Sequence, residues 1–283
     1  MWQGRTFTWR WPERLISMAG VAVLLLAAFT MLAPFLWMVL TSFMDELEVF
    51  QFPPRLLPER WLWHNWREAL TALPFARFFL NSLIMSLGIT AGQLLFCSMA
   101  GYAFARIRFP FRNAIFLAFL SFLMVPVIVL LIPRFLMVNF FGWIDTFWAL
   151  IIPEMVSVWG IFLMRQFFLG LPRDLEDAAR IDGASEWAIY WRIVLPLSKP
   201  ALATLGVFAF VGSWQSFLWP LIATRSLYMR TMEVGIASFH TIYSDNWPLQ
   251  MAAATAAVLP LVALFFFAQR YFVRGIALSG MKG

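Results

Sequence analysis

Six stretches of this sequence are long, apolar and almost free of charged side chains. They cover residues 15–44, 78–105, 113–133, 146–164, 200–224 and 246–269, and only the fourth contains an acidic residue, Glu154. Each is close to or longer than the roughly 20 residues that a helix needs to cross a bilayer. Hydrocarbon offers no water to backbone amides, so such segments are helical. The sequence therefore predicts an all-α, polytopic membrane protein of six transmembrane helices, with tolerated kinks at Pro34, Pro126, Pro153, Pro220 and Pro260.

The distribution of basic residues predicts the orientation. The chain has 283 residues, of which 62% are hydrophobic and 13% charged, and its formal net charge is +6. Fourteen Lys and Arg residues fall in the two termini and the connections after the second and fourth stretches, against seven in the other connections. By the positive-inside rule, both termini are cytoplasmic and the protein is a multi-pass protein of the cell (inner) membrane. The same rule explains the positive charge without a nucleic-acid partner.

The connection between the fourth and fifth stretches differs from the rest of the chain. Residues 165–199 carry ten of the 36 charged residues, a density that is costly in hydrocarbon and indicates an aqueous loop. Its local pattern predicts a helical hairpin. Asp174 is expected to cap the first helix, with Asp177 in a box-like position, and Gly183 to end it. Ser185 is expected to cap the second helix, which Pro196 ends together with Pro200.

Each helix of the hairpin has an amphipathic face. Leu175, Ala178 and Ala179 share one face of the first helix. On the second helix the apolar residues recur at i, i+3, i+4 and i+7, namely Trp187, Tyr190, Trp191 and Val194. Apolar faces seldom stay bare, so we expect this hairpin to dock against something.

The hairpin residues resemble a known motif. Asp177-Ala178-Ala179, Gly183 and Ile193-x-Leu195-Pro196, at this spacing, are similar to the EAA loop of permease subunits of binding-protein-dependent ABC importers. Flanking segments most resemble the carbohydrate-uptake branch, and within it the maltose-type second permease. These segments are Asn81-Ser82, Ala100 to Arg106, Met164 to Phe168, Trp214 to Leu221 and the tail from Gly275 to Gly283. The leading Glu of the motif is Asp177 here, preceded by Glu176.

This resemblance implies a type I ABC importer transmembrane fold and a division of the chain. Residues 1–14 would be a cytoplasmic N-terminus, 15–44 an added first transmembrane helix, 77–274 the ABC type-1 transmembrane core and 275–283 a cytoplasmic tail. The loop 171–196 would couple the permease to an ATPase. The implied coupling residues are Glu176, Asp177, Ala178, Ala179, Asp182, Gly183, Ala184, Trp187, Ile193, Leu195, Pro196 and Lys282.

The implied partners follow from the same resemblance. They are a homologous second permease, two ATPase subunits, an extracytoplasmic substrate-binding protein, a sugar and the lipid bilayer. The chain would form half of a translocation pathway that works by alternating access. Mono-, di- and oligosaccharides, polyols and glycerol phosphate are all open as substrates.

The chain lacks the residues for chemistry of its own. Its two lysines, Lys199 and Lys282, are followed by Pro and Gly, so neither completes the GxxxxGK[ST] phosphate loop. ATP and Mg²⁺ are therefore expected on the partner ATPase, and the chain is expected to be a transport subunit without a cofactor. His64 and His240 lie far apart in sequence and form no metal motif. Ion-coupled secondary transport is the alternative, but it favours several intramembrane ionisable groups and only Glu154 is present.

Glu154 is the main candidate for the substrate path. At 1.5 Å per residue it lies roughly 12 Å below the outer end of the fourth stretch. It either faces a polar cavity or pairs structurally with Arg134. Aromatic faces and amides suit sugar rings, so the other candidates, each also explicable by packing, are Asn81, Trp159, Trp214 and Gln215. Gly160 and Gly212 are expected at close helix contacts.

Overall fold

The computed structural model describes residues 11–239 and 246–279, without the side chains of residues 11–15 and 270–279. The regular structure in these ranges is helical throughout, which confirms the all-α prediction. The chain forms two compact units. The first comprises Met1–Ala69 with Asp245–Ala256, and the second comprises Leu70–Ser244 with Ala257–Gly283.

The first unit begins with a long apolar helix. Helix α1 (Trp11–Thr41) continues through Pro34, and its apolar side chains from Ile16 onward are largely exposed. Short helices α2 (Glu46–Val49) and α3 (His64–Thr71) follow. The ring of Phe43 packs against Trp61, Trp63 and Trp66, with centroids 4.8–5.8 Å apart. The segment after α1 is therefore folded around an aromatic cluster.

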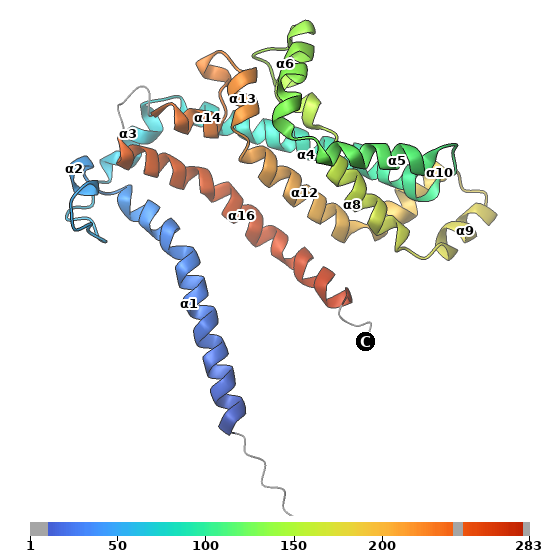
Figure 1. Ribbon diagram of the computed structural model, residues 1–283, viewed down its shortest axis with the longest axis horizontal. Coiled ribbons are helices and arrows are strands. Elements are labelled where there is room, and N and C mark those ends of the chain that lie inside the picture. Colours follow the sequence, from blue (N-terminus) through green and yellow to red (C-terminus); the bar gives the residue numbers. More distant parts are fainter. Residues whose placement is uncertain (1–10, 240–245, 280–283) are drawn as a thin grey trace, which may run out of the picture. The chain divides into compact units, whose positions relative to one another are not determined.

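The second unit is built around α4 (Phe75–Arg106), with α8 (Val158–Leu169) and α12 (Lys199–Trp214) packed along it (Figure 1). Glycines permit this close contact. A Cβ at Gly101 would lie 2.8 Å from Met164 Cβ, and one at Gly160 would lie 2.9 Å from Leu205 Cδ1. The expectation for Gly160 is confirmed. The one for Gly212 is wrong, because a Cβ there would meet nothing within 4 Å.

The third apolar stretch is bent far more than a tolerated kink. Helix α5 (Arg112–Ser121) and the turn η1 (Phe122–Met124) are followed by η2 (Val127–Leu130) and α6 (Leu131–Phe140), and the two halves meet at 100°. The expectation of one kinked helix is wrong here. Pro126 favours an extended residue before it, and Val125 has ψ 121°.

The fourth and fifth spans also contain breaks. The fourth consists of α7 (Phe147–Ile151), η3 (Ile152–Glu154) and α8, with a bend of 41°. In the fifth, α12 ends at Trp214 and α13 (Leu218–Ala223) resumes after it. The short helices η5 (Leu227–Met229) and α14 (Met232–Ala237) precede α16 (Trp247–Ser279), which continues through Pro260.

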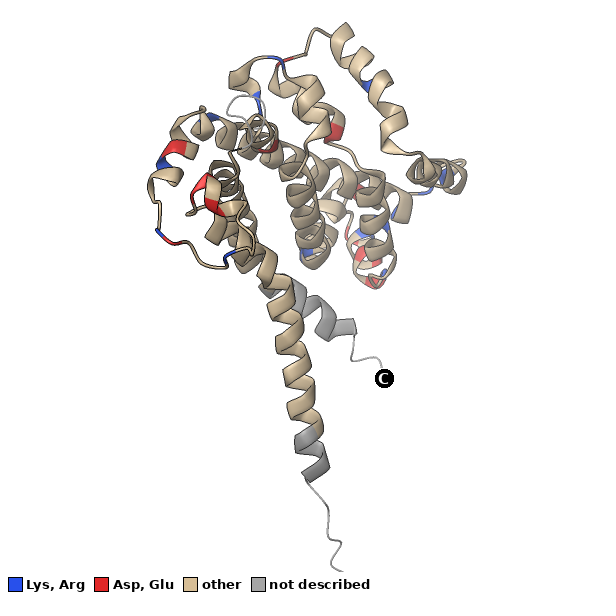
Figure 2. Ribbon diagram, turned by 60° about the vertical axis from the view of Figure 1, so that its left-hand side comes forward, with Lys and Arg blue, Asp and Glu red and all other residues tan. Residues whose placement is uncertain are grey.

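The described residues therefore contain three helices that are each long and apolar enough to cross a membrane, and up to six spans if each bent pair counts as one. The three are Ile16–Thr41, Phe75–Arg106 and Trp247–Gln269. Figure 2 shows the helical shafts mostly without charge, with Lys, Arg, Asp and Glu gathered near their ends. This arrangement positions the charged hairpin at the end of α4.

Candidate functional site

The loop between α8 and α12 is a helical hairpin, as the sequence predicted. Helix α9 (Asp174–Ile181) ends where Gly183 adopts φ +79°. The Gly183 amide donates to the Arg180 carbonyl (3.0 Å) and the Ala184 amide to the Ala179 carbonyl (2.9 Å). These two bonds form a Schellman motif, which needs a left-handed residue at the position of Gly183. Glycine adopts that conformation without a Cβ penalty.

The helix boundaries confirm one prediction and correct two. Ser185 caps α10 (Glu186–Ile189), accepting a bond from the Ala188 amide at 3.3 Å. Asp174 is not the N-cap of α9, because the helix begins at Asp174 and Arg173 precedes it without a side-chain bond. Pro196 does not end the second helix. The helical turns continue through it as α11 (Leu195–Leu197), and the chain bends only after Leu197.

Between α10 and α11 the chain forms a π-helical turn, η4 (Tyr190–Val194). The Leu195 amide donates to the Tyr190 carbonyl, five residues back. The chain then bends by 79° into α12 at Ser198, whose hydroxyl donates to the Val194 carbonyl at 2.7 Å. The residue pattern did not predict this turn. The expected aromatic face is divided, because Tyr190 and Val194 are buried while Trp187 and Trp191 are exposed.

The exposed side of the hairpin is apolar as well as charged. Ile181 is 87% exposed and Trp187 58% exposed, and Leu175 is exposed beside them. Ala178 and Asp177 also face outward, whereas Ala179 and Ala184 pack on the core under the hairpin. The predicted face of Leu175, Ala178 and Ala179 is thus divided between solvent and core.

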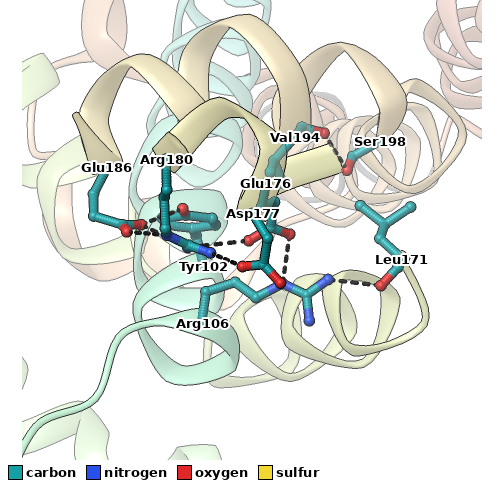
Figure 3. Close-up of polar contacts among 9 residues, drawn as sticks. All are labelled: Tyr102, Arg106, Leu171, Glu176, Asp177, Arg180, Glu186, Val194 and Ser198. Atoms are coloured by element: carbon teal, nitrogen blue, oxygen red, sulfur yellow. Dashed lines mark hydrogen bonds and ion pairs between the residues drawn. The ribbon is translucent and has the colours of Figure 1, made fainter. Parts of the chain in front are cut away.

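The two acidic residues of the motif have opposite environments (Figure 3). Glu176 is 2% exposed, and its Oε1 accepts from Nε of Arg106 at 2.7 Å. Arg106, the last residue of α4, is 3% exposed and also donates from Nη2 to the Leu171 carbonyl at 2.8 Å. Asp177 points outward and accepts from Nη1 of Arg180 at 2.7 Å. Glu176 is therefore held inside the protein, and Asp177 is the acid on the exposed face.

Arg180 connects the two helices of the hairpin. Its Nε donates to Glu186 Oε1 at 2.7 Å, and Glu186 Oε2 also accepts from the hydroxyl of Tyr102 at 2.8 Å. The bond from Arg180 holds the pKa of Glu186 below its usual value, against the opposing effect of partial burial. A cavity of about 380 Å³ beside this network is lined by Arg106, Ile107, Arg108, Arg173, Glu176, Asp177, Arg180 and Glu186.

The other predicted coupling residues occupy varied positions. Asp182 and Pro196 are exposed, while Ile193 and Leu195 are half-buried. Lys282 lies outside the described residues. Tyr102 and Arg106 were missed as contributors to this site. Both lie in the Ala100 to Arg106 segment that carries part of the family resemblance. The resemblance identified this segment but did not indicate that it bonds to the hairpin.

A second feature is a cavity of about 310 Å³ among α4, α8, α12 and α13. Glu154 and Trp159, both predicted, line it together with Gln93, Ser157, Ser216, Trp219 and further apolar residues. The carboxylate of Glu154 is bonded to Arg134, whose guanidinium carbon lies 3.7 Å from the centroid of the Trp219 ring. Glu154 thus both pairs with Arg134 and borders the cavity, and its side chain stays 41% exposed.

Three predicted path residues lie elsewhere. Asn81 is fully buried, and its Nδ2 donates to the carbonyls of Tyr228 (2.7 Å) and Arg230 (2.9 Å), which fixes the segment containing η5 to α4. Trp214 is fully buried and donates to the Ala257 carbonyl at 3.1 Å. Gln215 is exposed but does not border the cavity. Gln93, which the sequence reasoning missed, does border it and donates to the Glu154 carbonyl at 2.9 Å.

Comparisons with known proteins agree with this architecture. Residues 94–278 match the family described as binding-protein-dependent transport system inner membrane component. The arabinooligosaccharides transport system permease protein AraQ of Halalkalibacterium halodurans is 38% identical over 259 residues, covering 90% of this chain and 93% of that protein. The sn-glycerol-3-phosphate transport system permease protein UgpE of Yersinia enterocolitica is 36% identical over 264 residues, with the same coverage.

A solved structure is similar in fold. It is a bacterial ABC transporter involved in the import of the acidic polysaccharide alginate, with a TM-score of 0.80 and 21% identity over 94% of this chain and 100% of that one. The family match decides against ion-coupled secondary transport and against an enzyme. With its membrane-spanning helices and the hairpin at the end of α4, the chain belongs to the family of inner membrane components of binding-protein-dependent transport systems and is a permease subunit of an ABC importer.

Proposed function

We propose that this permease serves an ATP-driven sugar importer and that residues 171–196 couple it to a separate ATPase. The exposed apolar surface of the hairpin carries this proposal. Ile181, Trp187 and Leu175 project from a segment rich in charge, where bare apolar side chains are unfavourable unless a partner covers them. The core packing of Ala179, Ala184 and Tyr190 supports the hairpin from below, so a push on its outer face is transmitted inward.

The partners in this proposal are a homologous second permease, two ATPase subunits that hold ATP and Mg²⁺, and an extracytoplasmic binding protein. The hairpin and both termini are cytoplasmic, as the positive-inside rule indicates. Residues 77–274 act as the transmembrane core and α1 as an added helix. The Asn81 contacts that fix the outer segment of Tyr228 and Arg230 make that segment a firm docking surface for the binding protein.

The cavity supports an uncharged, hydroxyl-rich substrate. Its described wall carries one acid, Glu154, and no Lys or Arg. Trp159, Trp219 and Phe208 offer aromatic faces, and Gln93 and Ser216 offer polar groups. Aromatic surfaces with a few hydrogen-bonding groups suit sugar rings. A phosphate or carboxylate on the substrate would find no cationic partner in this wall, because the adjacent Arg134 is already paired with Glu154. We therefore favour a neutral saccharide, and half of its path is formed by this chain.

The coupling assignment is tested with a matched pair of glycines. Gly183 and Gly142 both have positive φ (+79° and +67°), and a Cβ at either would meet nothing within 4 Å. Gly183→Asp and Gly142→Asp therefore impose a similar backbone strain, on the order of 1–2 kcal/mol. We expect both variants to insert into the membrane. Only Gly183→Asp should lose co-purification of the ATPase, together with sugar uptake. Wild-type co-purification and uptake for Gly183→Asp would contradict the assignment.

The substrate class is tested on the purified complex with its binding protein. ATP hydrolysis is measured with an arabino-oligosaccharide, with sn-glycerol 3-phosphate and with an alginate oligosaccharide. We expect stimulation by the neutral saccharide and little by the two anions, because only the anions need a cationic partner, which the described cavity wall lacks. Stimulation by an anion alone would refute the neutral-substrate proposal while leaving the coupling assignment intact.

A further inference from the structure

Three residues of α4 bond to the hairpin at regular spacing. Ser98 Oγ and Tyr190 OH lie 2.7 Å apart, Tyr102 OH donates to Glu186 Oε2 at 2.8 Å, and Arg106 Nε donates to Glu176 Oε1 at 2.7 Å. The spacing is four residues, so these side chains form one stripe along the helix. We call Ser98, Tyr102 and Arg106 the α4 stripe. Figure 3 shows its Tyr102 and Arg106 reaching the carboxylates of the hairpin.

The bond at the end of the stripe joins two enclosed, oppositely charged side chains. The side chains of Arg106 and Glu176 are 3% and 2% exposed, and both Nε and Nη2 of the guanidinium have acceptors in the hairpin segment. A buried charge pair of this kind is sensitive to geometry, since a shift of either partner leaves a charge without compensation. Apolar contacts alone would let the two surfaces slide. The pair therefore fixes the hairpin to α4 in one register.

The same helix forms part of the cavity wall. Met85, Ile89 and Gln93 line the cavity and are also spaced by four residues. From Gln93 to Arg106 the helix rises by roughly 20 Å. Over these residues α4 continues without a break. A displacement of the hairpin that is fixed to the α4 stripe is therefore a displacement of the cavity wall.

We propose that the α4 stripe, and above all the Arg106–Glu176 pair, transmits the movement of the hairpin to the cavity. This inference rests on the proposed function of the hairpin as the coupling element. Arg106 and Tyr102 are positioning residues, because neither faces the ATPase side of the hairpin. Glu176 acts inside the permease, and Asp177 is left to the outer face.

The test uses the complete importer in proteoliposomes with its binding protein. In Arg106→Met/Glu176→Met both charges are replaced, so no uncompensated buried charge remains to block folding. We expect wild-type assembly and an ATPase rate at least half that of wild type. Sugar uptake per ATP hydrolysed should fall at least tenfold. The control is Arg55→Met/Glu59→Met, which removes an exposed ion pair and should leave uptake per ATP unchanged.

A milder variant is used if the double variant does not assemble. Arg106→Lys keeps the charge but cannot reproduce two bonds from a planar fork. We expect it to assemble and to show several-fold lower uptake per ATP. Wild-type uptake per ATP in whichever variant assembles would overturn the proposal. A wild-type complex that fails to bind the ATPase or to transport sugar would instead refute the proposed function itself.

Discussion

The contact between α4 and α8 at Gly101 gives a prediction whose size follows from the packing. A Cβ at Gly101 would lie 2.8 Å from Met164 Cβ and 3.0 Å from the Arg165 backbone nitrogen. These atoms belong to the neighbouring helix backbone or sit directly on it, so they cannot rotate away as the end of a side chain would. Gly101→Ala therefore forces the two helices apart, and such overpacking costs about 1–3 kcal/mol.

Helix propensity complicates any glycine substitution, and a second glycine removes that complication. Replacing a helical Gly by Ala gains about 0.5–1 kcal/mol from the backbone. Gly206 in α12 faces α4 at ordinary distances, where a Cβ would lie 3.7 Å from the Leu94 methyl groups. Gly206→Ala should thus gain the propensity term without the clash. The difference in stability between the two variants isolates the overpacking term of about 1–3 kcal/mol.

Thermal unfolding of the purified permease in detergent measures this difference. For a chain of this size about 1 kcal/mol corresponds to roughly 2–4 °C. We expect Gly206→Ala to unfold at or above the wild-type Tm, and Gly101→Ala to unfold roughly 2–12 °C below Gly206→Ala. Equal Tm values for Gly101→Ala and Gly206→Ala would refute the close packing of α4 against α8.

Four further predictions concern the site. Glu154→Gln leaves the half-buried Arg134 without its counter-charge, so complexes should assemble but transport the preferred sugar at an altered rate. Asp177→Ala removes the outward-facing acid and should weaken ATPase co-purification more than it lowers permease yield. Ser185→Ala removes the N-cap of α10, which costs about 1 kcal/mol of stability. Sugar uptake by this variant should fall only slightly. Asp182→Cys should resist an impermeant thiol reagent in intact cells while Glu59→Cys is labelled; the reverse pattern would overturn the orientation.

The sequence by itself determined the features that depend on near neighbours. The apolar stretches are covalently continuous, so their length alone indicates membrane helices. The turn at Gly183 and the cap at Ser185 are closed by backbone groups within five residues. The family motif combines such local signals, which is why the hairpin and the family were both predictable without coordinates.

Other features were decided by residues distant in the chain. Glu176 and Asp177 are adjacent, and successive helix positions differ in direction by roughly 100°. The choice of which one is buried depends on Arg106, 70 residues earlier. Asn81 likewise binds carbonyls 147 and 149 residues away, so its sequence context could not reveal that use. Burial and pairing are properties of the packed chain, and only the tertiary structure brings those partners together.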